Sequence, residues 1–235
     1  MWLLLGASTG FSQADIQSLR NRTYSDVNAD LFKDYSLQIG RGAAVFNGAE
    51  YKGKDPGIAG HQFYKFKNPQ YGSVQFNGFR YDSLLIAYDI AEDQLVQVYQ
   101  DRGSYFLIRM DLERVSGFLL DGHEFINIRQ DDKAPGGSGF FDLIYDGPTL
   151  VLAKRRKTVI PSSISGYLYE FKESDRYFVK SGDSYRPVTS GNGLYKIFRE
   201  RKKEIRNFVR SRRLTFRERP DEFLREVCTY LDRGE

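Results

Sequence analysis

Short runs rich in β-branched and aromatic residues, separated by turn signals, constrain this chain more than any other feature of its sequence. Tight-turn pairs recur beside these runs, at Asn47-Gly48, Asn77-Gly78, Asp121-Gly122, Asp146-Gly147 and Ser181-Gly182. Asn-Gly and Asp-Gly pairs suit the positive φ angles of two-residue hairpin loops. The runs themselves are SVQF, FRYDSLLIAYDI, QLVQVYQ, SYFLIRM, RVSGFLL, EFINIR, FFDLIY, TLVLAKRR, YLYEFK and RYFVK. The pattern predicts a mainly β domain over residues 43–189, an antiparallel β-meander folded as a sandwich or an open barrel.

Alternation within the runs indicates which faces supply the core. In YLYEFK, Tyr167, Tyr169 and Phe171 share one face, as alternate residues of a strand do. Each large apolar side chain that is buried contributes roughly 1.5–3 kcal/mol, so such aromatic faces readily build a β core. In TLVLAKRR, the apolar run Leu150–Ala153 is unbroken, which predicts a strand buried on both faces.

The hydrophobic period becomes helical after TSGNG, residues 189–193. At the helical period, six apolar residues fall within one stripe roughly 120° wide. They are Leu194, Ile197, Phe198, Ile205, Phe208 and Val209. Pro220 then begins a second helix, with Asp221 and Glu222 in the first turn, where the helix dipole favours negative charge. We therefore expect two amphipathic helices within residues 190–235, packed on the β domain.

The first of these helices carries a candidate anion-binding ridge opposite its apolar stripe. The formal charge of the whole chain is only +4, yet residues 196–219 hold eleven Lys or Arg against three Asp or Glu. The ridge would extend over roughly 20 Å of helix. Its members are Lys196, Arg199, Lys203, Arg206 and Arg210.

Two binding functions for this ridge compete with a purely structural interpretation. An anionic envelope surface or a nucleic acid would suit it, whereas the alternative is the solvated face of a docked helix. The aromatic residues share the buried side instead of alternating with the basic ones, which disfavours nucleic-acid readout. Arg201 falls within the apolar stripe, so either its side chain snorkels or the helix breaks near residues 199–201.

Residues for catalysis or metal binding are sparse. The single cysteine, Cys228, excludes an internal disulfide framework and a cysteine-rich zinc site, and we expect it to be a small buried hydrophobe. His123 lies in DGHEF with Asp121 and Glu124, but neighbouring residues of a strand point to opposite faces, so His123 and Glu124 cannot both bind one metal there. His61 has no nucleophile beside it in the sequence.

The carboxylate pairs Glu92-Asp93 and Asp131-Asp132 fall in expected turns, where solvated acids are ordinary. PGGSG lacks the Lys-Ser/Thr of a phosphate-binding loop. We therefore assign no catalytic, cofactor-binding or metal-binding residue, and we expect no cofactor.

The N-terminal stretch MWLLLGASTGFSQA is typical of the end of a secretory signal peptide. The apolar run Trp2–Leu5 is far shorter than the roughly 20 residues that span a bilayer, and no later segment reaches that length. No Lys or Arg precedes Arg20, so we expect the true start to lie upstream of Met1. The alternative is a buried N-terminal strand or helix. Residues 15–42 suggest at most one short helix.

Several stretches resemble a group of uncharacterised exported proteins of Bacteroidota-type Gram-negative bacteria. They are GFSQA, FNGAEY, GHQFY, GSVQFNGFRYDSLLIAYDI, GFFDLIYDGPTLVLAKRRK and RKKEIRNFVRSRRLTFRERPDEFLREVCTYLD. The resemblance spans most of the chain and implies export to the periplasm or the cell surface. It implies no activity and no functional residues.

These features lead us to expect a non-enzymatic envelope protein that binds another envelope protein or an anionic glycolipid. One alternative is an enzyme that acts on envelope carbohydrate or lipid through carboxylates. Another is a polyanion or nucleic-acid binder that uses the basic helix. An outer-membrane barrel would need strands of about 9–11 residues, and several of the expected strands are shorter.

Overall fold

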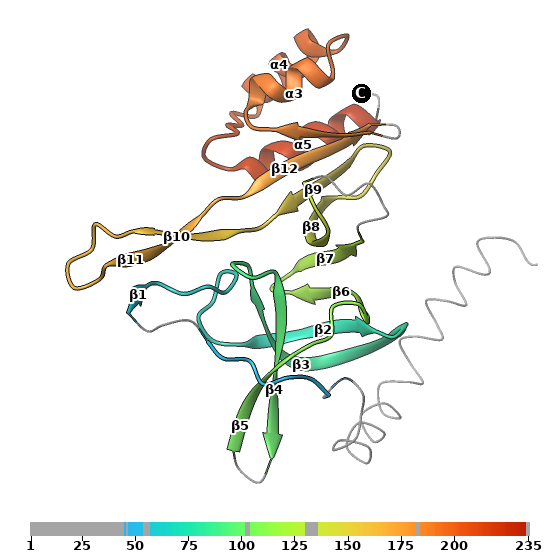
Figure 1. Ribbon diagram of the computed structural model, residues 1–235. Coiled ribbons are helices and arrows are strands. Elements are labelled where there is room, and N and C mark those ends of the chain that lie inside the picture. Colours follow the sequence, from blue (N-terminus) through green and yellow to red (C-terminus); the bar gives the residue numbers. More distant parts are fainter. Residues whose placement is uncertain are drawn as a thin grey trace, which may run out of the picture. The chain divides into compact units, whose positions relative to one another are not determined.

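The computed structural model describes residues 45, 47–53, 57–101, 104–129, 136–181 and 184–233 (Figure 1). The chain divides into a unit Met1–Asn47 and a unit Gly48–Glu235, and all described strands and helices belong to the second. The expected signal peptide and the segment 15–42 lie outside the described residues, as do Asp131 and Asp132.

Ten strands of the described residues form one antiparallel sheet (Figure 1). In spatial order they are β13 (Ser184–Val188), β12 (Arg176–Ser181), β9 (Leu150–Lys154), β8 (Gly139–Tyr145), β7 (His123–Ile128), β6 (Val115–Leu120), β2 (Gln70–Phe76), β3 (Phe79–Asp89), β4 (Gln94–Asp101) and β5 (Ser104–Arg109). Most neighbours in the sheet are also neighbours in the sequence. The predicted antiparallel meander is therefore confirmed.

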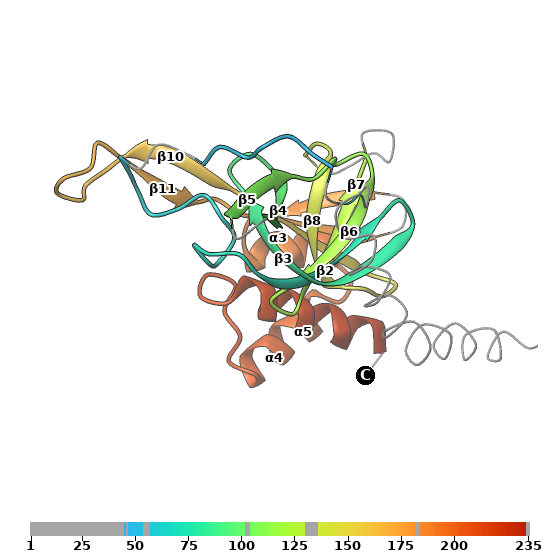
Figure 2. The same cartoon turned by 90° about the horizontal axis from the view of Figure 1, so that it is seen from below.

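A smaller sheet contains β1 (Ile58–Ala59), β11 (Tyr169–Glu173) and β10 (Lys157–Pro161), in that spatial order. β10 and β11 form an antiparallel hairpin between β9 and β12 in the sequence, while β1 pairs with β11 in parallel. Figures 1 and 2 both show this hairpin extending away from the large sheet.

Two of the predicted turn pairs form two-residue hairpin loops with positive φ. Asn77 and Gly78, with φ of 51° and 78°, connect β2 to β3. Asp121 and Gly122, with φ of 51° and 73°, connect β6 to β7. These residue types tolerate the left-handed region, so local chemistry places the turns and fixes the register of both hairpins.

Three helices follow the sheet: α3 (Gly191–Ile197), α4 (Lys202–Ser211) and α5 (Pro220–Arg233). The stretch expected as one helix is divided, because α3 ends at Ile197 and α4 begins at Lys202. The position of Arg201 in the apolar stripe predicts either a snorkelling side chain or a helix break near residues 199–201, and the structure has the break. Ser190 caps α3 by accepting a hydrogen bond from the backbone N–H of Gly193. None of the described helices is long and apolar enough to cross a membrane.

The helices gather on one side of the sheet and cover its β13–β8 end (Figure 2). Val151 and Ala153 on β9 point into this layer, whereas Leu152 packs on the opposite face with Phe141 and Phe178. The prediction that β9 is buried on both faces is thus confirmed. The core under the helices consists of Ile144, Val151, Ala153, Tyr177, Val179, Val188, Leu194, Ile205, Leu214, Phe223, Leu224, Val227, Cys228 and Leu231.

Candidate functional site

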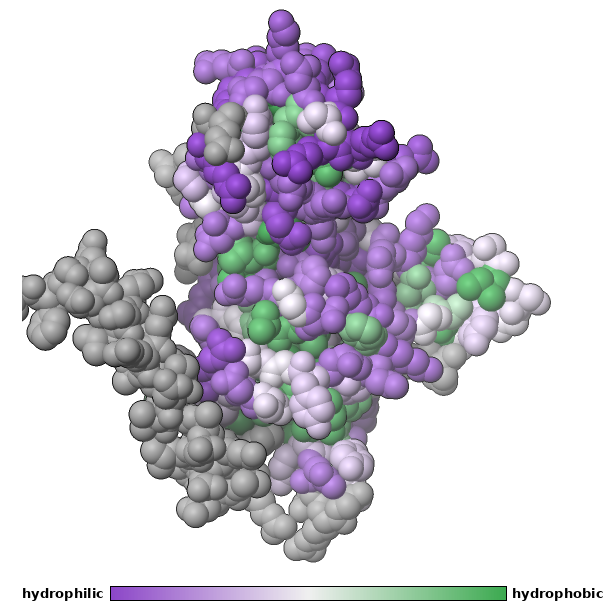
Figure 3. All heavy atoms as spheres, turned by 180° about the vertical axis from the view of Figure 1, so that it is seen from behind, coloured by the Kyte–Doolittle hydropathy of each residue, from purple (hydrophilic) through white to green (hydrophobic). Residues whose placement is uncertain are grey.

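The break between α3 and α4 divides the predicted basic ridge between two hollows. The prediction that the ridge lies on one continuous helix is therefore wrong. Arg206 and Arg210 line a hollow on α4. Lys196 and Arg199 line a different hollow at the α3–α4 junction. Lys203 lines neither of these hollows, although it is exposed on the same helix. Figure 3 shows strongly hydrophilic residues gathered over this helical region.

The hollow on α4 combines three arginines with apolar walls. Its volume is about 470 Å³, and it is a shallow depression that is largely open to solvent. Arg206 and Arg210 are one helical turn apart and therefore project side by side. The guanidinium of Arg206 lies 5.3 Å from the ring centre of Tyr195. The lining residues are Tyr195, Arg206, Val209, Arg210, Arg213, Leu214 and Thr215.

Arg213 reaches this hollow from a strained backbone position. Its φ is 53°, in the left-handed region that normally favours glycine at the end of a helix. The N–H of Leu214 donates to the carbonyl of Val209, and the N–H of Arg213 donates to the carbonyl of Arg210, which together make a Schellman cap. Buried Leu214 packs against the helix core and holds the turn in place. Strain of this kind, held by its surroundings, often marks functional positions.

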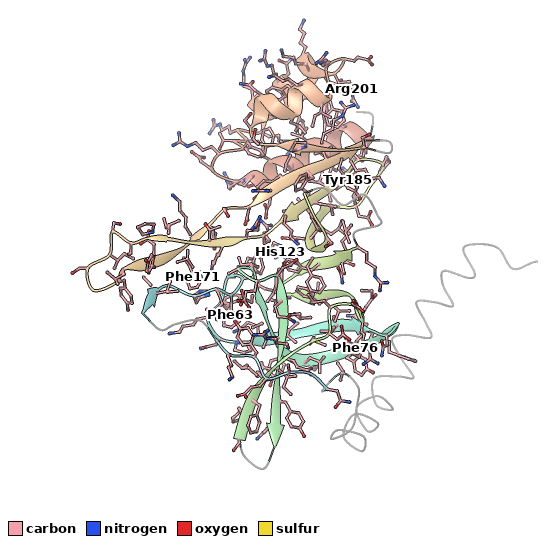
Figure 4. The ribbon with its side chains drawn as sticks, in the orientation of Figure 1. Phe63, Phe76, His123, Phe171, Tyr185 and Arg201 are labelled. Atoms are coloured by element: carbon pink, nitrogen blue, oxygen red, sulfur yellow. The ribbon has the colours of Figure 1, made fainter. Side chains whose placement is uncertain are left out.

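The three arginines of the hollow have no acidic partner among the described residues. The ion pairs of this region are Arg201 with Glu204 and Arg219 with Glu222. Arg201 also donates to the carbonyl of Leu231 at 2.6 Å, so its guanidinium joins α4 to α5 (Figure 4). Arg201 is therefore structural, whereas the charges of the hollow remain available to a ligand.

The hollow at the α3–α4 junction suits an anion less well. Its volume is about 560 Å³. Lys196, Arg199 and Arg186 line it, but so do Glu200 and Arg201, and Glu204 neutralises Arg201. Arg206, Arg210 and Arg213 therefore form the stronger candidate site.

A second polar cluster, buried beneath α5, is built around Arg155. The Arg155 side chain is 6% exposed, and its guanidinium donates to three carboxylates. The distances are 2.5 Å from Nη2 to Asp142, 2.7 Å from Nη1 to Asp175 and 2.5 Å from Nη2 to Asp221. His123 on β7 joins the cluster, with Nδ1 2.8 Å from Oδ2 of Asp142 (Figure 4). Residues far apart in the sequence thus share one cation.

The other ring nitrogen of His123 contacts Lys65, with 2.9 Å between Nε2 and Nζ. A lysine ammonium can only donate, so Nε2 accepts and the ring proton lies on Nδ1, facing Asp142. Lys65 also pairs with Asp121 at 2.8 Å, in the turn predicted for that residue. Glu124, the other acid of DGHEF, is exposed and is not part of this cluster.

His123, Asp142 and Asp221 have potential metal-ligand atoms within 4.8 Å of one another. The guanidinium of Arg155, however, already binds both carboxylates. A further cation about 4 Å from that guanidinium would meet a repulsion of about 4 kcal/mol per unit charge at an effective dielectric constant of 20. We therefore regard the Arg155 guanidinium, instead of a metal ion, as the cation that Asp142 and Asp221 bind.

Asp221, the carboxylate of the cluster that lines the adjoining hollow, does not provide a general acid. Burial acts to raise the pKa of Asp221, but the hydrogen bond and charge of Arg155 outweigh it, and the pKa is lowered. A catalytic acid needs the reverse, a carboxyl that stays protonated near neutral pH. The adjoining hollow is lined by residues of both charges, Arg219 and Arg225 together with Glu218 and Glu222. Asp221 therefore gives no support to the carboxylate enzyme that the sequence left open.

The remaining sequence candidates lie apart from both clusters. Cys228 is fully buried under α5, and burial raises the pKa of its thiol to about 12, so it is the small hydrophobe that the sequence indicated. His61 is half-buried, and burial together with the charges of Lys157 and Lys67 lowers its pKa.

Asp93 corrects the expectation of a solvated acid in the turn after β3. It is partly buried and accepts hydrogen bonds from the hydroxyl of Tyr88 at 2.5 Å and from Nζ of Lys154 at 2.6 Å. Its carboxylate contacts the buried Lys154 at the end of β9. Asp93 is thus part of an internal ion pair.

No protein-family model, curated protein or solved structure matches this chain.

Proposed function

We propose that this chain is a non-enzymatic protein of the bacterial envelope that binds a phosphorylated glycolipid through the hollow on α4. The observation that carries the proposal is the set of three arginines, Arg206, Arg210 and Arg213, around an apolar-walled hollow without an acidic partner in the described chain. Support for the envelope comes from the N-terminal stretch MWLLLGASTGFSQA, which is typical of exported proteins.

The walls of the hollow favour an amphiphile over a plain polyanion. Guanidinium groups recognise phosphate oxygens in a two-pronged geometry. Val209 adds partly exposed apolar surface beside them, which a sugar face or the start of an acyl chain would cover. Nucleic acid is bound along an extended series of phosphates, but here the basic residues are divided between separate hollows. The ring of Tyr195 already lies against Arg206.

The competing role for these arginines is to complement the helix dipole at the end of α4. The negative end of a helix carries roughly half an elementary charge, and a cation near it contributes about 0.3–1 kcal/mol. A single Lys or Arg with ordinary helical backbone angles would supply this stabilisation. The hollow has three guanidinium groups, one of them on a residue with positive φ. They supply more positive charge than the end of the helix requires.

The proposal is tested by sedimentation with phosphatidylcholine vesicles that carry lipid A, compared with vesicles of phosphatidylcholine alone. The double variant Arg206→Gln and Arg210→Gln should reduce binding to lipid A vesicles by at least about tenfold, since each lost charge-assisted contact contributes roughly 1.5–3 kcal/mol. The double variant Lys202→Gln and Lys203→Gln is the matched control, because it removes two exposed charges from the same helix outside the hollow.

Equal losses in the arginine double variant and in the lysine double variant would show a diffuse charge effect and would refute the hollow as a site. Stronger binding to double-stranded DNA than to lipid A vesicles would favour the polyanion alternative. In that case affinity should fall by orders of magnitude between about 50 and 200 mM salt.

A further inference from the structure

The hairpin of β10 and β11 contains an uncharged stretch at its tip. Residues 158–169, TVIPSSISGYLY, hold no Asp, Glu, Lys or Arg, although charged residues make up 28% of the chain and about three would be expected in such a stretch. The large apolar side chains there face solvent. Their exposed fractions are 45% for Val159, 51% for Ile164, 43% for Tyr167, 82% for Leu168 and 50% for Tyr169.

The strand register gathers apolar side chains on one face of this hairpin. Val159 lies opposite Phe171, and Pro161 lies opposite Tyr169, so all four share a face. Figure 3 shows hydrophobic residues on the projecting hairpin, and Figure 4 shows Phe171 on it. The sequence indicated that Tyr167, Tyr169 and Phe171 share a face that could supply a core. The structure leaves that face largely uncovered.

The tip is a built turn. The N–H of Ser162 donates to the carbonyl of Leu168 at 3.0 Å, and the N–H of Tyr167 donates to the carbonyl of Ile164 at 3.2 Å. The hydroxyl of Ser162 donates to Glu170 and also accepts from the N–H of Ile164. Several polar groups of the tip are thereby satisfied within the hairpin, while Leu168 is held outward.

We propose that the tip of this hairpin inserts into the outer layer of a lipid bilayer. Charged side chains are costly inside a membrane, so their absence from the whole tip suits insertion. Tyr side chains favour the membrane–water interface, where the ring is apolar and the hydroxyl remains wet. Ile164 and Leu168 would enter the acyl region, with Tyr167 and Tyr169 at the level of the lipid head groups.

A protein partner fits the hairpin less well. Protein interfaces usually combine an apolar centre with a polar rim and are enriched in arginine, but residues 158–172 contain no arginine, and Glu170 and Lys172 lie on the face opposite Val159 and Phe171. Strand addition at the outer edge of β10 would also meet Pro161, which lacks a backbone donor. Lipid therefore matches the composition of the tip better than a protein surface does.

Insertion builds on the proposed function, because both place the protein at an envelope membrane. A single weak membrane signal gives marginal binding, and stable attachment needs two. The arginines of α4 would supply the electrostatic signal, and the hairpin would supply the apolar one.

A tryptophan placed at the tip tests the insertion directly. Trp2 is the only tryptophan of the chain, so the variant Leu168→Trp in a Trp2→Phe background reports on the tip alone. With phosphatidylcholine vesicles that carry lipid A, we expect a blue-shifted emission and strong quenching by brominated acyl chains. Tyr71→Trp in the same background is the matched control, because Tyr71 on β2 is 75% exposed and should remain unquenched.

A loss-of-binding variant makes the two proposals separable. Leu168→Asp should weaken vesicle binding by at least about tenfold without changing the Tm, since Leu168 is exposed in the fold. If vesicles bind through Arg206 and Arg210 while the tryptophan of Leu168→Trp stays in water, the insertion is refuted and the proposed function stands. If that tryptophan is quenched equally with or without those arginines, the insertion stands and the hollow is refuted. Shielding of the same tryptophan by added protein but not by vesicles would refute insertion in favour of a protein partner.

Discussion

Nη2 of Arg155, directly after β9, lies 2.5 Å from Oδ2 of Asp221 in the first turn of α5, 66 positions later in the chain. This ion pair attaches the N-terminal end of α5 to the large sheet. Asp221 also lies where the helix dipole favours an acid, so two electrostatic effects act on one side chain. Asp142 and Asp175 bind the same guanidinium, so one arginine links the first turn of α5 to two further acids of the β domain.

Replacement of that arginine should be among the most damaging substitutions in the described chain. Arg155→Met leaves the carboxylate of Asp142, whose side chain is 1% exposed, buried without its cation. Removing one partner of a buried pair costs about 3–5 kcal/mol, and urea denaturation would measure the loss. Arg156→Met is the control, because Arg156 is exposed and the change should stay within about 0.5 kcal/mol. Similar effects of both variants would contradict the role given to Arg155.

Asp221 and Asp175 should contribute to acid stability with opposite signs. The pKa of Asp221 is lowered, because Arg155 outweighs burial, so its contribution is present above the unfolded pKa of about 3.9 and is lost as pH falls through the folded value. Burial raises the pKa of Asp175 despite the attraction of Arg155. Its contribution is therefore present below about pH 3.9 and is lost as pH rises through the folded value.

Two variants separate these contributions. Asp221→Asn should make the loss of stability between about pH 5 and 3 shallower than in the wild type, and Asp175→Asn should make it steeper. Urea midpoints across that range provide the measurement, with exposed Asp146→Asn as the substitution control. Slopes that change in the same direction for both variants would argue against the opposite signs.

The strands of the sheet interior could be predicted because each has its own local pattern. Every run expected as a strand forms one, from β2 to β9 and at β11 and β12. The strands that sequence reasoning missed are β1, β10 and β13, and all three lie at sheet edges. Edge strands tolerate proline and charge because one side needs no partner. Pro161 in β10 and Pro187 in β13 weakened the pattern for this reason.

The Arg155 cluster could not be predicted, because its members lie on separate elements. The sequence singled out His123 but offered Glu124 as its neighbour, whereas the partner is Asp142 on the adjacent strand β8. The one local signal was a basic run, Lys154–Arg156, at the end of a strand expected to be buried on both faces. Arg206 and Arg210 of the hollow belong to the ridge predicted from the sequence, whereas Arg213 does not. The break before α4 and the strained turn at Arg213 depend on tertiary packing.

Gly139 at the start of β8 should be intolerant of a side chain, whereas Gly137 should tolerate one better. Their φ angles are nearly equal, 111° and 112°, and L side chains rarely adopt such angles, so alanine meets backbone strain of about 1–3 kcal/mol at each position. A Cβ at Gly139 would lie 1.8 Å from Oδ2 of Asp93 and 2.6 Å from Nζ of Lys154, whereas at Gly137 nothing lies within 4 Å.

Gly139→Ala should therefore disrupt the Asp93–Lys154 ion pair and cost about 3 kcal/mol or more in the free energy of unfolding. Gly137→Ala should cost only the strain. Thermal and urea denaturation of the two variants give the comparison, and equal losses would show that the ion pair adjusts without cost.

Arg213 allows function and stability to be separated at one residue. Glycine is favoured at its left-handed position, so Arg213→Gly should stabilise the fold by about 0.5–1 kcal/mol, after the loss of a helix-end cation is subtracted. For a chain of this length that corresponds to a Tm increase of roughly 2–4 °C per kcal/mol. The same variant removes one of the three cations of the hollow, and lipid A binding should weaken by about fivefold or more.

The neighbouring residue supplies a control of opposite sign. Arg212 is exposed in a right-handed helical conformation, with φ of −89°, so Arg212→Gly should destabilise the fold by about 1 kcal/mol. Arg212 does not line the hollow, and its replacement should leave lipid A binding nearly unchanged. Calorimetry and vesicle sedimentation on both variants measure the two effects separately. A gain of stability in Arg213→Gly with undiminished binding would mean that the strained arginine serves no ligand at this site.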